Sequence, residues 1–164
     1  VILQEVPMSE KKSSVQRVRA ALEELQIPVQ LKELPQSTRT ALEAAEAVQS
    51  SVGQIVKSLV FTNANNQPLL ILTSGSNHVD EKKVGQALGY QICFANADIV
   101  RQETGFAIGG VSPYGLKKKI PIYIDRDLLQ HELVWAAAGS SYAVFSISPQ
   151  DLVDTTGGKV ITVH

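Results

Sequence analysis

The chain of 164 residues carries 16 acidic and 15 basic side chains, which gives a formal net charge of −1. This balance excludes a protein whose main role is to coat nucleic acid through a broad basic surface, although it leaves room for a local basic patch. The length is that of one domain with one hydrophobic core.

Cysteine content and hydropathy exclude further classes of protein. Cys93 is the single cysteine, so an intramolecular disulfide is excluded, and its apolar neighbours predict a buried side chain. No stretch approaches the roughly 20 apolar residues of a membrane span, and the N-terminus lacks the pattern of a signal peptide. We therefore expect a cytoplasmic protein without membrane contact.

The N-terminal quarter begins without a hydrophobic period, so residues 1–12 are expected to form a loosely held arm. From Ser14 the apolar residues recur with helical spacing, and Pro28 ends this helix. Residues 29–34 alternate as in a strand, which Pro35 closes.

The middle of the chain contains a capping box, in which Thr40 and Glu43 open an alanine-rich helix. A turn-forming run over 63–68 separates two apolar strands and predicts an antiparallel hairpin. The expected elements here are a helix over 40–48, strands over 55–61 and 69–73, and short helices over 80–89 and 96–105.

Three strands are expected towards the C-terminus, over 120–124, 132–138 and 142–146. Ser148 and Pro149 form a typical helix start, and a last strand follows over 159–163. Strands and short helices mix without strict alternation, which predicts an α/β (α+β) fold. We expect one domain over 1–164, with a mixed, mostly antiparallel sheet or barrel-like core flanked by short helices.

Lys57 is the first candidate functional residue, because its strand is otherwise almost entirely apolar. Alternation places it on the same face as Leu59 and Phe61. Such a lysine either extends its ammonium group to an edge of the sheet or is retained for a charge that it meets. Both interpretations remain open from the residues alone.

Residues 104–115 form a glycine-rich loop with four glycines and one proline. Backbone amides without a side chain approach a ligand closely and donate hydrogen bonds to a carbonyl group or an oxyanion. The alternative is an ordinary turn at the end of a strand. Lys117, Lys118 and Lys119 follow directly, and they are either a solvated charge run or contacts to a phosphate backbone.

Signatures of other chemistries are missing from the sequence. No cluster of His, Cys, Asp and Glu has the spacing of metal ligands, and there is no phosphate loop, dinucleotide fingerprint or nucleophile elbow. We therefore expect neither a metal nor another cofactor.

Three segments together resemble the YbaK/ProX family, freestanding relatives of the editing insertion domain of bacterial prolyl-tRNA synthetase. They are residues 57–61, 77–84 and 104–115, in the order and spacing of the family. The resemblance runs from about Ser13 to Val153, and the glycine-rich segment is its most specific element.

The resemblance implies an editing-domain fold and a trans-acting aminoacyl-tRNA deacylase. Such enzymes hydrolyse the ester between an incorrect amino acid and the 3′-terminal ribose of tRNA, here tRNA(Pro) carrying a small residue such as Ala or Cys. A water or the neighbouring ribose hydroxyl attacks. Lys57 corresponds to the family's catalytic lysine. The family's loop corresponds to Gly109, Gly110, Val111, Ser112 and Pro113. The predicted substrate-binding residues are these five with Ser58, Thr38, Gly139 and Ser140, and the predicted tRNA-binding residues, from their place beside the loop, are Lys117, Lys118 and Lys119.

The resemblance also implies two partners. The first is the aminoacylated 3′ end of tRNA, and the second is prolyl-tRNA synthetase. Gly139, Ser140 and Ser141 stand where some alanine-specific members have a histidine, so the amino acid removed stays open. The alternative function is a non-catalytic module that binds tRNA or a synthetase and retains the editing-domain fold.

Overall fold

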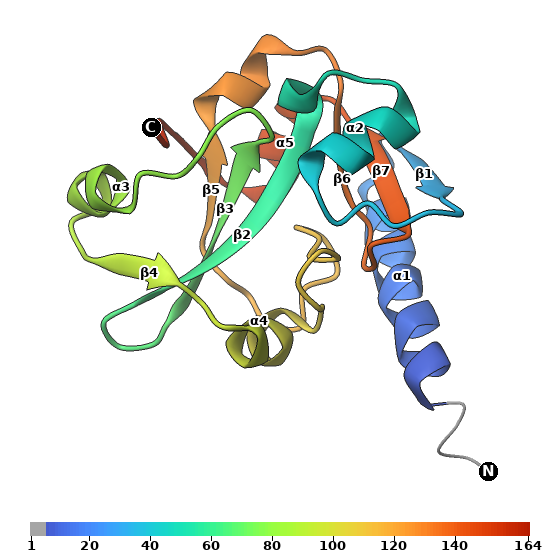
Figure 1. Cartoon of the computed structure of the whole chain (residues 1–164), viewed down its shortest axis with the longest axis horizontal. Coiled ribbons are helices and arrows are strands. Elements are labelled where there is room, and N and C mark those ends of the chain that lie inside the picture. Colours follow the sequence, from blue (N-terminus) through green and yellow to red (C-terminus); the bar gives the residue numbers. More distant parts are fainter. Residues whose placement is uncertain (1–5) are drawn as a thin grey trace.

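Across residues 6–164, the part of the chain that the computed structural model describes, eight strands form one mixed sheet with five α-helices around it (Figure 1). The strand order is β1-β7-β6-β2-β3-β5-β8, and β4 pairs with β2 outside this path. The strands are β1 (Gln30–Glu33), β2 (Ile55–Asn63), β3 (Pro68–Ser74), β4 (Ile92–Phe94), β5 (Ile122–Asp125), β6 (Val134–Ala137), β7 (Ala143–Ile147) and β8 (Lys159–Ile161). The helices are α1 (Val6–Leu25), α2 (Ala41–Val48), α3 (Glu81–Leu88), α4 (Ala97–Thr104) and α5 (Pro149–Thr156).

The expected hairpin is confirmed by the antiparallel pairing of β2 with β3, in which Lys57 lies opposite Thr73 and Leu59 opposite Ile71. Parallel pairs join β2 to β6, β3 to β5 and β5 to β8, and the sheet is therefore mixed, as predicted. β3 is buried along almost its whole length because its residues alternate between two separate cores. This buried hairpin is the rigid support of the site described below.

The helix boundaries follow the capping signals in the sequence. In α2 the Thr40 hydroxyl accepts a hydrogen bond from the Glu43 amide (3.1 Å), while the Glu43 carboxylate accepts one from the Thr40 amide (3.1 Å). The predicted capping box is thereby confirmed. The side chains of Asp80, Asn96 and Ser148 cap α3, α4 and α5 by accepting one hydrogen bond from a backbone amide of the first turn.

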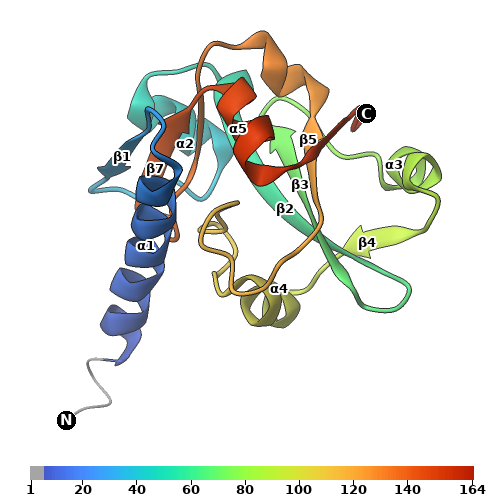
Figure 2. The same ribbon diagram turned by 180° about the vertical axis from the view of Figure 1, so that it is seen from behind.

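The helices lie on both faces of the sheet. Val18 of α1 and Leu152 of α5 belong to one hydrophobic cluster with Phe145 of β7, so these two helices cover the same face (Figure 2). α2 lies on the opposite face, where Ala44 packs with Trp135 of β6 (Figure 1). In a third cluster, Val84 of α3 packs with Phe61 of β2 and Ile71 of β3.

Three features of the structure differ from what the sequence indicated. α1 begins at Val6, so the helix expected from Ser14 also includes residues 6–12, while residues 1–5 lie outside the described residues. β4 was not predicted, because three residues are too few for a visible period. Cys93 lies in this short strand and is exposed, not buried, since Ile92 takes the inward position.

The remaining differences concern strand ends: β5 starts at Ile122 rather than at residue 120, and β8 stops at Ile161 rather than at residue 163. Within residues 6–164 there is no helix with both the length and the apolar character needed to cross a membrane.

Candidate functional site

A break in strand pairing along β2 creates the site. β6 pairs only with the first two residues of β2, and β4 pairs only with its last three. Between them, residues 57–60 have no strand partner on this edge among the described residues. The Val60 carbonyl accepts a hydrogen bond from the Ala95 amide (3.0 Å). Because backbone groups alternate between the two edges of a strand, Ser58 directs its N–H and C=O to the same gap.

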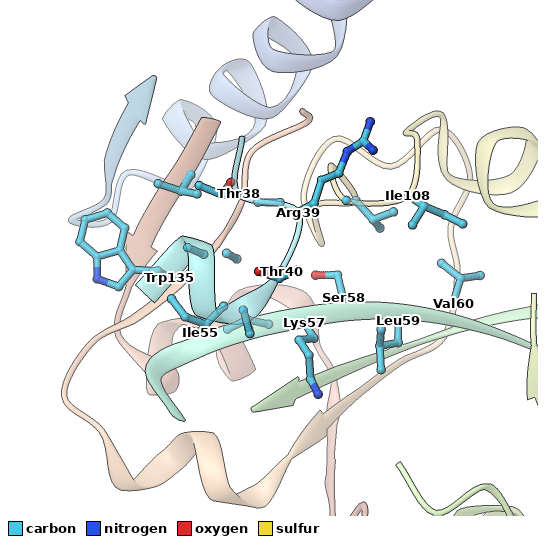
Figure 3. A pocket seen from close by; sticks show the side chains of 18 of the residues that line it. Thr38, Arg39, Thr40, Ile55, Lys57, Ser58, Leu59, Val60, Ile108 and Trp135 are labelled. Carbon is cyan, nitrogen blue, oxygen red and sulfur yellow. The ribbon is translucent and has the colours of Figure 1, made fainter. Parts of the chain in front are cut away.

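The gap opens into a pocket of about 490 Å³ between β2, the start of α2 and the glycine-rich loop (Figure 3). One end of this pocket is apolar and is lined by Ala44, Val48, Ile55, Trp135 and Val144. At the mouth, Phe94 is 56% exposed and Ile108 is 60% exposed. Exposed large apolar side chains beside a pocket are typical of a surface that a ligand covers.

Ser58 supplies an unsatisfied polar group to this pocket. Its side chain extends from β2 into the pocket, towards the side where Thr40 and Arg39 lie (Figure 3). Its hydroxyl oxygen is buried and has no hydrogen-bond partner among the described residues. A buried hydroxyl left unpaired costs about 1–3 kcal/mol. Such an atom in a pocket wall indicates where a ligand would supply the missing partner.

Lys57 lines the same pocket through its position on β2, but its side chain extends from the other side of the strand, away from Ser58 (Figure 3). Its ammonium group donates a hydrogen bond to the Asn77 carbonyl oxygen. Burial lowers the pKa of Lys57 below its ordinary value, and the nearby carboxylate of Asp125 opposes this shift. The lysine therefore donates to a backbone carbonyl near a carboxylate, and it forms no ion pair among the described residues.

A polar network holds Asn77 in place behind β2. The buried carboxylate of Asp125 accepts hydrogen bonds from the Ser74 amide and the Asn77 side chain, both at 2.9 Å. Asp127 accepts a further bond from the Asn77 side chain (2.8 Å) and pairs with His164 (3.0 Å). The bonds from Asn77 and then from His164 lower the pKa of Asp127. This network fixes the carbonyl group that receives the Lys57 ammonium.

A second pocket of about 310 Å³ adjoins the first, and Arg39 and Ile108 line both. The two pockets divide the residues that the sequence predicted as substrate-binding. The first contains Thr38, Ser58, Gly109 and Val111, and the second contains Gly110, Gly139 and Ser140.

The other predicted residues line neither pocket. Ser112 and Pro113 are buried, and the Ser112 hydroxyl accepts a hydrogen bond from the Tyr114 amide (3.1 Å), so these residues shape the loop. Lys117, Lys118 and Lys119 are exposed, and Lys118 pairs with Glu103 (2.7 Å). A surface pair of this kind contributes little to stability.

Several pocket residues were missed from the sequence. Arg39 precedes a capping box and has no periodic neighbours, while Phe94 and Trp135 look like core residues in apolar runs. The exposure of Phe94 is visible only in the structure. Among residues 6–164, no group of three His, Cys, Asp or Glu side chains could hold a metal ion.

Comparisons with known proteins point to one family. A model of the aminoacyl-tRNA editing domain matches residues 35–155, a span that includes Lys57 and the glycine-rich loop. The chain is 33% identical to YwhH of Bacillus subtilis over 78% of its own length and 82% of that protein. It is 26% identical to EbsC of Enterococcus faecalis, a candidate Cys-tRNA(Pro)/Cys-tRNA(Cys) deacylase, over 73% of this chain and 74% of that one.

A solved structure agrees with these relatives. The crystal structure of a candidate trans-editing enzyme for prolyl tRNA synthetase superposes with a TM-score of 0.85 and 45% identity. The superposition covers 92% of this chain and 96% of the other.

Proposed function

The chain belongs to the aminoacyl-tRNA editing domain family, as the resemblance to YbaK/ProX proteins predicted, and from this premise we propose that it is a trans-acting aminoacyl-tRNA deacylase. It would hydrolyse the ester of mischarged tRNA, with tRNA(Pro) carrying Ala or Cys as the first substrates to consider. The observation that carries this proposal is the unpartnered Ser58 hydroxyl in the wall of the first pocket.

The apolar end of the first pocket supports the proposal that the enzyme selects amino acids with a small side chain. Ala41 and Ala44 of α2 line it on one side, and Ala136 and Ala137 of β6 line it on the other. Such walls admit a small apolar group and give it no charged partner. Discrimination of one methylene by size is worth only about 1–3 kcal/mol, so we expect more than one small amino acid to be accepted.

The polar middle of the pocket supports binding of the ester. Ser58 offers an unpaired hydroxyl and, at the gap in the sheet, its backbone N–H and C=O. Gly109 lies across the pocket in the glycine-rich loop, where the lack of a side chain leaves room for the ribose. Phe94 at the mouth is suited to stack on the terminal adenine. A water or the neighbouring ribose hydroxyl would attack the ester carbon.

Incubation with charged tRNA tests the proposal directly. We expect the protein to release Ala and Cys from tRNA(Pro), with rates within about 200-fold of each other because size alone separates them. Ser-tRNA(Pro) completes the panel, and Pro-tRNA(Pro) is the control that should be spared. Binding of tRNA without loss of any ester would instead support the non-catalytic module, in which the pocket only holds the 3′ end.

Ser58→Ala is expected to separate function from stability. Because the hydroxyl is buried without a protein partner, its removal should not lower the free energy of unfolding and should raise it by up to about 1–3 kcal/mol. Loss of one hydrogen bond to the substrate should lower kcat/KM roughly three- to tenfold. Chemical denaturation and the deacylation assay measure the two effects.

Ser112→Ala is the matched control for Ser58→Ala, since this buried hydroxyl already accepts a bond from the Tyr114 amide. It should cost about 1–3 kcal/mol of stability. If Ser58→Ala also destabilises the protein and leaves kcat/KM unchanged, Ser58 is a structural residue.

A further inference from the structure

The second pocket is built by close backbone approaches that leave little freedom for its floor. A Cβ atom on Gly110 would lie 2.7 Å from the Cα of Ser140, and one on Gly139 would lie 2.7 Å from the carbonyl oxygen of Ser14 in α1. Gly139 also has φ of +100°, which favours glycine. The floor therefore joins the glycine-rich loop, the β6–β7 turn and α1 in one fixed arrangement.

The walls of this pocket carry positive charge. Arg39 and Arg101 line it, and no acidic residue does so within residues 6–164. Neither arginine forms an ion pair with a carboxylate among the described residues. Two guanidinium groups without an internal partner around one pocket form a site for an anion, and arginine matches phosphate geometry well.

Arg39 lies at the boundary between the two pockets, which we call the ridge. Its neighbour Thr38 is buried and donates two hydrogen bonds to the Ser141 carbonyl, one from the amide (2.7 Å) and one from the hydroxyl (2.8 Å). Gly109 lies against the aliphatic part of Arg39, since a Cβ there would be 3.4 Å from the arginine Cγ. The guanidinium group points away from Ser58 (Figure 3), and it belongs to the lining of the second pocket as well as the first.

An exposed aromatic ring completes the second pocket. Tyr142 lines it and is 45% exposed, and the adjoining Ile108 separates it from the mouth of the first pocket. Aromatic rings stack on unpaired bases, and arginines pair with the phosphates between those bases. A site with both groups beside a pocket for a terminal nucleoside fits the next nucleotide of a single strand.

We propose that the second pocket binds the penultimate nucleotide of the substrate's 3′ strand, and that Arg39 pairs with the phosphate joining it to the terminal adenosine. This inference rests on the proposed function, because it requires the terminal adenosine to occupy the first pocket. Arg101 supports the phosphate from α4, and Tyr142 stacks on the base. Thr38 is a positioning residue that fixes Arg39.

Equilibrium binding of adenosine and of the dinucleotide cytidylyl-(3′→5′)-adenosine, followed by NMR titration, tests the proposal without any catalytic step. The wild-type protein should bind the dinucleotide at least about tenfold more tightly than adenosine. Arg39→Gln should weaken dinucleotide binding far more than adenosine binding and so remove most of this advantage, because the nucleoside has no phosphate. Lys82→Gln, at an exposed position on α3 outside both pockets, should bind both ligands as the wild type does.

A second control separates a defined phosphate site from general positive charge. The triple change Lys117→Ala, Lys118→Ala and Lys119→Ala should leave dinucleotide binding intact and weaken only the binding of whole tRNA, with a flatter salt dependence. An equal loss of dinucleotide binding in this variant would overturn the assignment to Arg39.

The remaining outcomes keep the two proposals apart. If the wild type deacylates charged tRNA but binds the dinucleotide no more tightly than adenosine, the second pocket is not a nucleotide site and the proposed function stands. The same conclusion follows if Arg39→Gln keeps the advantage of the dinucleotide. If the wild type neither deacylates nor binds either ligand, both proposals are wrong.

Discussion

Replacement of Lys57 by alanine is expected to lower kcat/KM for deacylation about a hundredfold, the lower end of the effect of removing one donor that stabilises an oxyanion. The Lys57 ammonium has three donor hydrogens, and Asn77 takes one of them. Contact with the ester requires the side chain, which has a flexible stem, to turn from Asn77 towards the gap beside β2, and this turn frees all three donors for the substrate.

The pH dependence gives a second measure of this role. Burial lowers the pKa of Lys57 from 10.5, so the charged form is lost at a lower pH than for a free lysine. Activity that depends on the ammonium group should fall as the pH rises through this lowered pKa. The background-corrected profile of the Lys57→Ala variant should lack this alkaline fall.

Stability should respond differently from activity. Because the folded-state pKa of Lys57 is lowered, its contribution to stability is present above the unfolded value and lost as the pH falls through the folded value. Removal of the charge therefore should not weaken folding at neutral pH through this linkage. Lys57→Met keeps most of the side-chain stem and is the matched variant. A folded Lys57→Met protein with near wild-type turnover would show that the lysine serves only the Asn77 network.

Gly109→Val is expected to lower kcat/KM between about tenfold and a hundredfold, because small displacements in a reaction site have effects of this size. Gly109 lines the first pocket with φ of +92°, and a Cβ on it would lie 3.4 Å from the Cγ of Arg39. A valine there narrows the space for the ribose and pushes Arg39 off the ridge. The strain of a side chain at positive φ adds about 1–2 kcal/mol of destabilisation.

Gly89→Val controls for that strain. Gly89 has a similar φ of +88°, but a Cβ there meets no atom within 4 Å, and the residue caps α3 away from both pockets. The two variants should lose comparable stability, while only Gly109→Val should lose activity. Equal activity losses in Gly109→Val and Gly89→Val would show that the glycine-rich loop is an ordinary turn.

The helices and the hairpin were predictable because their signals are local. The capping box at Thr40 and the caps at Asp80 and Asn96 each satisfy backbone groups within one turn, so no distant contact is needed. β2 and β3 were visible as apolar runs joined by a short turn. β4 was missed, since it forms only by pairing with the far end of β2.

The glycine-rich loop was recognised from the sequence, but its division between two pockets was not. Gly109 and Gly110 are neighbours in the chain and line different cavities, because Gly110 packs directly against Ser140 from the β6–β7 turn. That approach depends on a segment 30 residues away. The same is true of Arg39, whose place on the ridge depends on the bonds of Thr38 to Ser141.

By itself, the sequence determined the class of the fold, the family, and the prominence of Lys57 and the glycine-rich loop, because these depend on periodicity, local caps and short motifs. Alternation along the strand already separated Lys57 from Ser58 in the sequence. Only the tertiary structure decided that Lys57 faces Asn77 and that Ser58 faces the pocket. The pocket itself exists because β6 and β4 leave a gap on β2, and strand pairing over such distances has no local signal.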